Sequence, residues 1–579
     1  MRCQIDYSVF KMKKKIGNFR YIIIIFVIFG ATGCVLVRLF YLQVLNHNFY
    51  SALAEGQHGF NEKIIPQRGE IFIQEKGGIW HPLATNRNWQ AVFLVPKEVT
   101  EKNEVAQKVG PLLGIPEEKI LDKLKNPDDL YEPLQSKVND DLVKKIKDLN
   151  LSGVYTIPDG WRWYPQGTLA SHILGFVGIK DNQRVGQYGL EEYFEQELKG
   201  RSGFMESQKD ALGRSLLVNN YSFEPAQNGD NLYLTLDQNV QYTVQNKLKS
   251  VLEKWHASGG CAIVMEPKSG AIRAMVSFPD FDPNEYNKVE NIDVFLNSCT
   301  QKLYEPGSVF KPITMAAGLD TNIINPETTY VDTGSVKIGE YTIANAQGKI
   351  YGLSSMTNVL EKSINTGAIF VERQIGGDTF RKYIEAFGFD KPLGIDLEGE
   401  VSGNLKNIDE KYEINFATAS FGQGISVTPL EMAFSIGAIA NSGKLMQPYI
   451  VEKIVDANGK EQITQPKMIR QVISSATAGK LTAMLVSTVL NGYDKIKIDD
   501  YFVAGKTGTA QIPNKDKRGY SEETNHTFAG YAPAYNPKFL IFLSIEKPQG
   551  IEFASESLAP VFSELAQYLF NYYNIPPDR

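Results

Sequence analysis

The most apolar stretch of the chain lies close to its N-terminus. An apolar run extends from Tyr21 to Val37, and five basic residues precede it: Lys11, Lys13, Lys14, Lys15 and Arg20. This run is just long enough to cross a bilayer as a helix, and its basic flank predicts that the N-terminus stays in the cytoplasm. A cleaved signal peptide is the alternative, but apolar residues resume after Arg38, which favours a retained anchor.

The sequence therefore predicts a cytoplasmic tail at 1–18 and a single-pass transmembrane anchor at 19–43 in the cytoplasmic (inner) membrane, with everything after it outside the cytoplasm. From 44 to 230 the pattern mixes helix and strand. Between about 98 and 150, charged residues alternate with apolar ones at helical spacing: Ile120, Leu121 and Leu124, then Leu142, Ile146 and Leu149. No nucleophile stands beside a base in this domain, so we expect a structural or docking role.

A second domain is predicted at 231–579. Residues 231–237 alternate like a strand, and Asp237 is a suitable N-cap for the helical pattern that follows. Two apolar runs, 260–267 and 270–276, predict a β-hairpin. Further strands are expected at 503–512 and 539–545, and an apolar helix near the C-terminus.

Composition narrows the possible functions. The chain has 579 residues, 43% of them hydrophobic and 22% charged, which is typical of folded protein, and its formal charge of −6 gives no sign of nucleic-acid binding. The four cysteines are not spaced as metal ligands and make a disulfide framework unexpected; Cys261, inside an apolar strand, is interpreted as a buried thiol. The six histidines show no ligand spacing, so neither a metal nor another cofactor is expected.

Candidate chemistry begins at Ser308. Pro306 and Gly307 are poor helix residues, so a helix is expected to begin at or just after Ser308. Residues three apart share a helix face, which places the Lys311 amine beside the Ser308 hydroxyl. A lysine can take the proton of a serine only if its pKa is lowered. Alone, a Ser-x-x-Lys pair is weak evidence, because such pairs commonly arise by chance on solvated surfaces.

Two later segments change this assessment. Ser363 and Asn365 form a Ser-x-Asn, and residues 506–508 form a Lys-Thr-Gly. Ser-x-x-Lys, Ser-x-Asn and Lys-Thr-Gly in this order are the motifs of serine β-lactamases and penicillin-binding proteins. Three such motifs separated by domain-scale gaps are very improbable by chance.

The chain as a whole resembles the class B penicillin-binding proteins, the membrane-anchored transpeptidases of the division or elongation type. Besides the three motifs, the resemblance covers segments 38–43, 68–71, 186–191, 235–237, 421–424 and 428–429. An aspartate often found after the segment at 68–71 is missing, and Gln74 and Glu75 stand nearby instead. The resemblance implies an α+β fold: a penicillin-binding/β-lactamase-like transpeptidase domain, with helices around an antiparallel sheet and an all-α lobe, preceded by an elongated non-catalytic pedestal or dimerisation-type domain.

The resemblance implies that the substrate is the D-Ala-D-Ala end of a peptidoglycan stem peptide. With this substrate, the residues suggest a division of roles. Ser308 would attack the penultimate D-Ala carbonyl of a peptidoglycan stem peptide, with Lys311 as base and the charge of Lys506 lowering the pKa of Lys311. Ser363 could pass the proton to the leaving amine, and Asn365 could bind the amide backbone of the substrate.

The strand that carries Lys506 would bind the rest of the substrate. Lys506, Thr507 and Thr509 are suited to hold its terminal carboxylate. Gly508 leaves room for close approach of a substrate backbone; alternatively, a glycine in a strand marks a bulge. The resemblance implies an oxyanion hole made by the backbone N–H groups of Ser308 and Thr509.

Other functions remain possible on these motifs. A D-Ala-D-Ala carboxypeptidase or a serine β-lactamase would use the same groups but admit water as the second nucleophile. A non-catalytic wall-assembly scaffold or β-lactam sensor would keep only the fold. The anchor, the additional domain and the intact motifs favour a penicillin-binding transpeptidase in bacterial cell-wall synthesis. Its partners would be stem peptides, β-lactams and a polytopic membrane glycosyltransferase.

Overall fold

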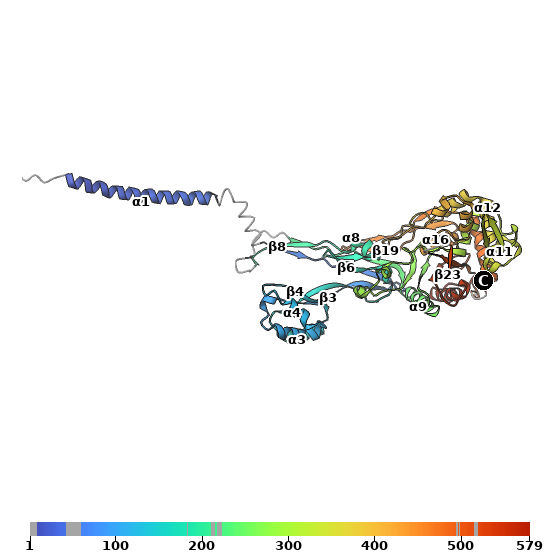
Figure 1. Cartoon of the computed structure of the whole chain (residues 1–579), viewed down its shortest axis with the longest axis horizontal. Coiled ribbons are helices and arrows are strands. Elements are labelled where there is room, and N and C mark those ends of the chain that lie inside the picture. The colour runs from blue at the N-terminus through green and yellow to red at the C-terminus, as the bar shows by residue number, and fades with distance from the viewer. Residues whose placement is uncertain are drawn as a thin grey trace, which may run out of the picture. The chain divides into compact units, whose positions relative to one another are not determined.

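The computed structural model describes residues 8–41, 59–181, 183–209, 215–216, 223–493, 496, 498–514 and 519–579 (Figure 1). The chain divides into two compact units. The first comprises residues 1–66 and 201–227, and the second comprises residues 67–200 and 228–579.

The first unit contains the long helix α1 (Ser8–Phe40) and a small antiparallel sheet. Within α1, the stretch Ile23–Phe40 is long and apolar enough to cross a membrane. In the sheet, β8 (Gly203–Lys209) pairs with β1 (Gly59–Ile64), β10 (Phe223–Glu224) and β9 (Ser215–Leu216). The apolar helix expected from the sequence is therefore present.

A seven-stranded sheet runs through the first part of the second unit. Its order is β20-β19-β11-β2-β3-β4, with β5 also on β3. The strands are β2 (Ile71–Gln74), β3 (Trp80–Leu94), β4 (Glu132–Val138), β5 (Val154–Trp163), β11 (Asn231–Asp237), β19 (Val451–Val455) and β20 (Glu461–Ile463). Strand β11 lies between β2 and β19, so segments before and after the expected boundary at 231 share one sheet.

Three helices pack against the end of this sheet where β3 pairs with β4. They are α3 (Lys102–Leu113), α4 (Glu117–Lys123) and α5 (Asp140–Asp148), and their core includes Ile120, Leu124 and Ile146. The helical pattern predicted for about 98–150 is confirmed, with β4 inserted between α4 and α5. Shorter elements follow: α6 (Ser171–Leu174), β6 (Phe176–Lys180), β7 (Gln183–Gln187), α7 (Gly189–Tyr193) and α8 (Glu195–Leu198).

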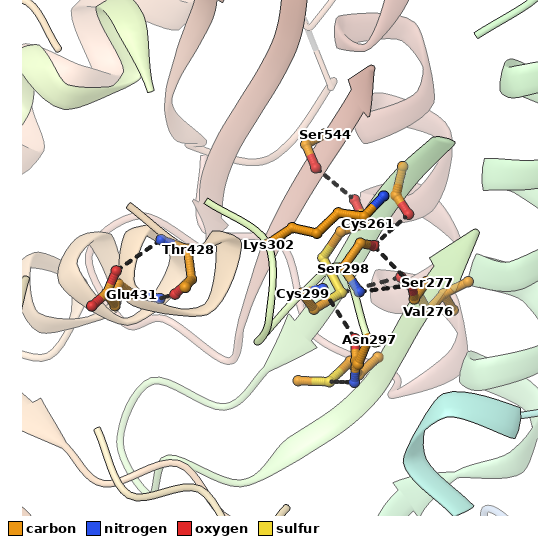
Figure 2. Close-up of a disulfide and its surroundings, with 12 residues drawn as sticks. Cys261, Val276, Ser277, Asn297, Ser298, Cys299, Lys302, Thr428, Glu431 and Ser544 are labelled. Atoms are coloured by element: carbon orange, nitrogen blue, oxygen red, sulfur yellow. Dashed lines mark hydrogen bonds between the residues drawn. A yellow bond between two sulfur atoms is a disulfide. The ribbon is translucent and has the colours of Figure 1, made fainter. Parts of the chain in front are cut away.

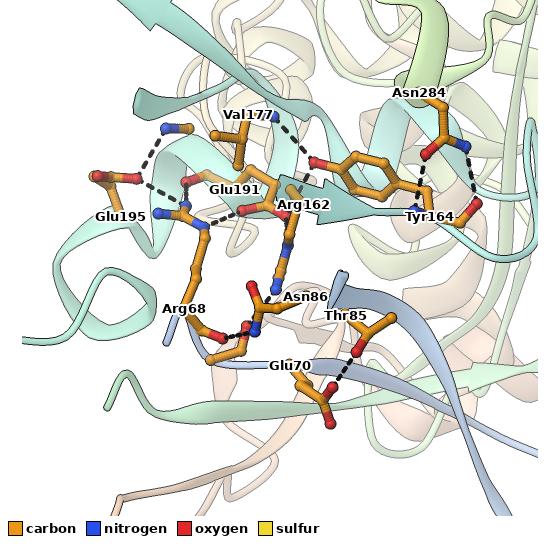
Figure 3. A network of polar contacts seen from close by, with 12 residues as sticks. Arg68, Glu70, Thr85, Asn86, Arg162, Tyr164, Val177, Glu191, Glu195 and Asn284 are labelled. Carbon is orange, nitrogen blue, oxygen red and sulfur yellow. Dashed lines mark hydrogen bonds and ion pairs between the residues drawn. The ribbon is translucent and has the colours of Figure 1, made fainter. Parts of the chain in front are cut away.

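A buried cluster of opposite charges joins two segments that the sequence singles out, 68–71 and 186–191 (Figure 3). The carboxylate of Glu191, fully buried, pairs with Arg68 Nε and Arg162 Nε at 2.6 Å each. The Tyr164 hydroxyl donates to the same carboxylate at 3.2 Å, and Glu195 pairs with Arg68 at 2.7 Å. Burial alone would raise the pKa of Glu191, but the two arginines outweigh it and lower that pKa.

The second part of this unit is organised around a five-stranded antiparallel sheet of order β13-β12-β24-β23-β22. The strands are β12 (Gly259–Met265), β13 (Ile272–Phe278), β22 (Ala504–Pro513), β23 (Tyr520–Ala532) and β24 (Phe539–Glu546). The hairpin expected from 260–267 and 270–276, and the strands expected at 503–512 and 539–545, are confirmed.

Helices cover both faces of this sheet because successive strand side chains point to opposite sides. On one face, Ala262 and Val264 pack with α9 (Gln238–Lys254) and α19 (Ala559–Tyr572). On the other, Ile263 and Met265 belong to the core that includes α10 (Lys311–Asp320), α16 (Pro429–Ala440) and α17 (Ser475–Gly492). The Asp237 side chain caps α9 by accepting from two backbone N–H groups, as predicted.

This part contains further strands and α-helices, several of which contact α10. They are the short strands β14 (Thr329–Asp332), β15 (Ser335–Ile338), β16 (Tyr341–Ala344), β17 (Gly352–Ser355), β18 (Lys444–Met446) and β21 (Met468–Gln471), and the helices α11 (Met356–Glu361), α12 (Asn365–Ile375), α13 (Gly377–Ala386), α14 (Lys406–Asp409), α15 (Glu413–Ala419) and α18 (Ala554–Ser557). Together with the antiparallel sheet they confirm the α+β class.

A disulfide corrects one expectation. Cys261 on β12 is bonded to Cys299, which lies in the loop leading to Ser308 (Figure 2). Their Cα atoms are 5.4 Å apart, and both residues are buried. The Ser298 hydroxyl beside the bond contacts Ser277 Oγ at 2.8 Å. The interpretation of Cys261 as a free thiol was wrong, because the two cysteines are 38 positions apart in the sequence and only the fold brings them together.

Candidate active site

Ser308 lies in a single 3₁₀ turn, η5 (Gly307–Phe310), immediately before α10. The α-helix thus begins at Lys311, three residues later than the earliest start that the sequence allowed. Pro312 then falls in the first turn of α10, where its missing N–H costs nothing. This turn-to-helix junction places the serine hydroxyl and the lysine amine on the same side, with Ser308 Oγ 3.0 Å from Lys311 Nζ.

Lys311 is completely buried although its amine is polar. Besides Ser308, its Nζ contacts the Ser363 carbonyl oxygen at 2.6 Å, Asn365 Oδ1 at 2.8 Å and Ser363 Oγ at 3.2 Å. Burial, and after it the positive charge of Lys506, lower the pKa of Lys311 well below the ordinary value of 10.5. The structure therefore holds a lysine suited to act as a base.

Ser363 and Asn365 lie where α11 ends and α12 begins. Ser363 has a φ of +54°, an uncommon backbone conformation for a residue with a side chain. Its Oγ lies 3.2 Å from Lys311 Nζ and 3.0 Å from Lys506 Nζ, so one hydroxyl joins the two amines. The Asn365 amide also donates to the Ala344 carbonyl at 3.1 Å, which fixes its orientation.

Lys506, on β22 and 1% exposed, faces this pair from the edge strand of the sheet. Its Nζ contacts Ser363 Oγ at 3.0 Å, the Thr507 carbonyl oxygen at 3.2 Å and the phenol oxygen of Tyr493 at 3.1 Å. Sequence reasoning missed Tyr493, which follows α17 and belongs to none of the three motifs. Among the residues that the structure describes, neither Lys311 nor Lys506 forms an ion pair.

A glycine is needed at position 508 because the protein's own atoms pack against it, and not because a substrate backbone needs the space. A Cβ at this position would lie 2.7 Å from the Pro306 carbonyl oxygen and 3.0 Å from the Val309 nitrogen. The Cβ would also lie 2.3 Å from Thr527 Oγ1 on β23. The space beside Gly508 is therefore filled by Thr527 and by the serine's own turn, which β22 approaches closely. This brings the backbones near Ser308 and Thr509 together, where the oxyanion hole is expected.

The threonines on either side of Gly508 differ in their contacts. The Thr507 hydroxyl contacts Tyr493 at 2.8 Å. The Thr509 hydroxyl accepts from the Ala554 N–H at 3.0 Å, at the start of α18. Its own proton can still be donated to a ligand.

The glycine-rich loop at 421–424 packs against the serine turn. Gly307 N donates to the Gly422 carbonyl at 2.9 Å, and a Cβ on Gly422 would lie 2.2 Å from the Gly307 carbonyl oxygen. Glu305 accepts from the Gly424 N–H at 3.1 Å, and burial raises its pKa to about 7. The loop thus holds the backbone of the turn that carries Ser308 in place.

His526 lies in the protein interior, where its contacts indicate a packing role. It is buried on β23, and its Nδ1 lies 2.8 Å from Ser557 Oγ. Burial lowers its pKa to about 4. Among the described residues, no group of three His, Cys, Asp or Glu side chains is placed to hold a metal ion.

Comparisons with known proteins agree with this geometry. Residues 260–567 match the model of the penicillin-binding protein transpeptidase domain, and residues 63–234 match that of the penicillin-binding protein dimerisation domain. Stage V sporulation protein D of Bacillus subtilis is 34% identical over 537 residues, covering 91% of this chain and 82% of that protein. Peptidoglycan D,D-transpeptidase FtsI of Escherichia coli is 27% identical over 562 residues, covering 94% and 92%.

Solved structures share the fold. Penicillin-binding protein 2X of Streptococcus thermophilus superposes with a TM-score of 0.71 at 24% identity, covering 88% of this chain and 80% of that one. Penicillin-binding protein 3 of Mycobacterium tuberculosis, complexed with aztreonam, gives 0.69 at 24% identity, covering 90% and 98%. Because one domain model matches more than half of the chain and a second matches most of what precedes it, the chain belongs to the class B penicillin-binding proteins.

Proposed function

We propose that this membrane-anchored peptidoglycan D,D-transpeptidase works through an acyl-enzyme on Ser308, with Lys311 as the base. The activity follows from the family: relatives are named peptidoglycan D,D-transpeptidase, and the family model of the transpeptidase domain spans the candidate active site. The observation that carries the assignment of residues is the burial of Lys311 with its Nζ 3.0 Å from Ser308 Oγ.

The contacts of Lys311 fit a neutral amine, which has two N–H donors and one lone pair. Its two shortest contacts, at 2.6 and 2.8 Å, are to the Ser363 carbonyl oxygen and Asn365 Oδ1, and both of these atoms can only accept. If they take the two N–H groups, the lone pair remains for the proton of the Ser308 hydroxyl. The lowered pKa of Lys311 favours this neutral form.

In the first half-reaction, Ser308 Oγ attacks the penultimate D-Ala carbonyl carbon while its proton passes to Lys311 Nζ. The oxyanion is bound by the backbone N–H groups of Ser308 and Thr509. As the C–N bond breaks, the proton held on Lys311 Nζ passes through the Ser363 hydroxyl, which lies between the two lysines, to the leaving D-Ala amine, and Lys311 becomes neutral again. The terminal carboxylate is bound by Lys506, Thr507 and Thr509.

In the second half-reaction, an amine from a neighbouring stem peptide attacks the ester carbonyl carbon and gives a proton to the neutral Lys311. As the ester C–O bond breaks, Lys311 returns that proton to Ser308 Oγ. The products are a new peptide cross-link and free enzyme. β-Lactams acylate the same serine, and the amine then reacts poorly with the resulting ester. A carboxypeptidase or β-lactamase would differ in letting water replace the amine, and turnover of the acyl-enzyme distinguishes these alternatives.

We further propose that the anchor lies in the cytoplasmic membrane with residues 1–18 inside and the catalytic domain, at 231–579, outside. The buried Cys261–Cys299 bond supports this orientation, because disulfides persist mainly in oxidising compartments outside the cytoplasm. Addition of a membrane-impermeant protease to intact protoplasts or spheroplasts should digest the catalytic domain. Full protection of that domain would contradict the orientation.

A transpeptidase needs glycan strands made by a polymerase. We propose a polytopic membrane glycosyltransferase as that partner, bound through the anchor at 19–43 and the non-catalytic domain at 44–230. Co-purification from detergent-solubilised membranes should recover it with the whole chain. A variant in which an unrelated membrane helix replaces residues 19–43 should recover less of it. Recovery of no glycosyltransferase by the wild type would contradict the proposal.

The assignment of the nucleophile is tested by labelling the full-length protein in detergent with a fluorescent penicillin over time. Ser308→Ala should abolish labelling. Ser487→Ala is the matched control, because that hydroxyl contacts Glu361 at 2.6 Å and Asn491 at 3.1 Å, neither of which is a site residue, and it should be labelled like the wild type. A persistent label supports a transpeptidase, whereas rapid loss of the label supports a β-lactamase. If the wild type takes no label, acylation by a D-alanyl thioester decides between a resistant enzyme and a scaffold.

A further inference from the structure

Tyr493 connects the end of α17 to the strand that carries Lys506. Its side chain is buried, and its ring packs edge-on against Phe528, with the ring centroids 6.4 Å apart. Its phenol oxygen contacts three atoms of β22: Lys506 Nζ at 3.1 Å, Thr507 N at 3.1 Å and Thr507 Oγ1 at 2.8 Å. No motif includes this residue, yet it contacts both Lys506 and Thr507.

The chemistry of these atoms fixes the direction of each hydrogen bond. The ammonium of Lys506 and the backbone N–H of Thr507 can only donate, so both donate to the phenol oxygen. That oxygen has two lone pairs and one proton, and both lone pairs are then used. Its proton must therefore be donated to Thr507 Oγ1.

The direction of this last bond determines what Thr507 can offer a ligand. A hydroxyl that accepts from Tyr493 keeps its own proton free, and the Thr507 side chain is partly exposed. It is thus set as a donor toward an incoming acceptor. Tyr493 also completes the contacts of Lys506, whose three donors face three acceptors: Ser363 Oγ, the Thr507 carbonyl and Tyr493.

We propose that Tyr493 is a positioning residue for recognition of the substrate's terminal carboxylate. Its phenol sets the Thr507 hydroxyl as a donor and holds the Lys506 ammonium in place, so that the hydroxyl donates to the anion while the ammonium attracts it through its charge. This inference rests on the proposed function, in which the two residues bind that carboxylate. A purely structural role would instead need only the aromatic ring, which the contact with Phe528 already uses.

Tyr493→Phe separates the two roles because it removes one oxygen and keeps the ring. The test uses full-length protein and two thioesters, N-benzoyl-D-alanyl-thioglycolate, which carries a carboxylate, and its neutral methyl ester. We expect kcat/KM for the carboxylate substrate to fall about tenfold, mostly through a higher KM, since one hydrogen bond to a charged group is typically worth that factor. For the methyl ester the change should stay below about twofold, because it lacks the anion that the Thr507 hydroxyl and the Lys506 charge recognise.

Tyr531→Phe is the matched control. Tyr531 is also buried, and its hydroxyl contacts Thr482 Oγ1 at 2.8 Å, away from β22 residues 506–507. This variant should treat both substrates alike. Thr507→Ala removes the proposed donor directly and should reproduce the selective loss of Tyr493→Phe, which keeps the test usable if the tyrosine variant folds poorly.

The outcomes are distinct. An equal fall with both substrates in Tyr493→Phe, or no fall with either, overturns the role of Tyr493 while the function stands. A wild type that reacts equally well with both substrates also overturns it, because there is then no carboxylate recognition to position. A wild type that neither substrate acylates overturns the proposed function itself.

Discussion

Two clusters of charged side chains are buried in the larger unit, one around Glu191 and one around Lys311. In the first, a carboxylate lies between two guanidinium groups at 2.6 Å each. In the second, two lysines face each other across the hydroxyl of Ser363. Glu191 and Lys311 are both fully buried, so burial does not distinguish the clusters. What differs is whether the charge has an opposite partner.

The difference appears in the direction of the pKa shifts. Around Glu191, the arginines outweigh burial and favour the charged form of the carboxylate. Around Lys311, burial and a second positive charge act together and favour the neutral amine. A buried group with oppositely charged partners stays in its charged form. A buried group without such a partner can exchange a proton during a reaction. Charge balance thus separates a structural cluster from a reactive one.

The largest expected effect is on the reactive cluster. Lys311→Met replaces the base by an apolar side chain of similar length, and we expect acylation by a fluorescent penicillin to slow by about 10²–10⁴, the usual contribution of a general base. The midpoint of thermal unfolding should stay the same or rise, because a buried unpaired amine has been removed. Lys302→Met, at a partly exposed lysine, is the control and should acylate normally. Acylation of Lys311→Met at more than one-tenth of the wild-type rate would rule out Lys311 as the base.

The converse change is Glu191→Gln. It leaves Arg68 and Arg162 buried without a counter-charge, so the free energy of unfolding in urea should fall by about 3–5 kcal/mol. The acylation rate of the folded protein should not change. Glu195→Gln breaks only the more exposed pair with Arg68 and should cost about 0–1 kcal/mol. If Glu191→Gln slowed acylation selectively and left stability intact, the comparison would be wrong.

The smallest and most graded effect is the dependence on pH. Lys311 must be neutral to act, so acylation should reach a plateau above its lowered pKa and fall about tenfold per pH unit below it. The stabilisation from Glu191 should be fully present above its unfolded pKa of 4.5 and be lost as pH falls through the lower folded value. Rate and stability profiles recorded on the same samples should therefore differ. Identical profiles would show that acid inactivation is merely unfolding.

Much of the site could be predicted because most of its residues lie in short sequence motifs. Ser308 and Lys311 are neighbours through helix geometry alone, and the structure places them 3.0 Å apart. That Ser363, Asn365 and Lys506 lie in the same site required the family resemblance, since no local rule brings residues 143 positions apart together. The catalytic roles of these residues stay predictions until the variants are measured.

Other features depend on contacts that only the folded chain makes. Tyr493 belongs to no motif, and it contacts Lys506 of β22 only because the end of α17 lies beside that strand. The pairing of Cys261 with Cys299 depends on how the loop before Ser308 lies against β12. Gly508 could be read as space for a ligand, whereas the structure fills that space with the turn of Ser308. Each case involves a partner that is distant in sequence and chemically unremarkable by itself.

The buried disulfide has a consequence for how the protein is made. Cys261 and Cys299 are 1% and 0% exposed in the finished fold, so an oxidant has to reach them before the domain closes around them. A catalytic domain produced in a reducing cytosol would therefore carry two enclosed thiols in the loop that leads to its nucleophile. Export to an oxidising compartment, or refolding with a thiol–disulfide couple, is the route to enzyme in its native covalent form.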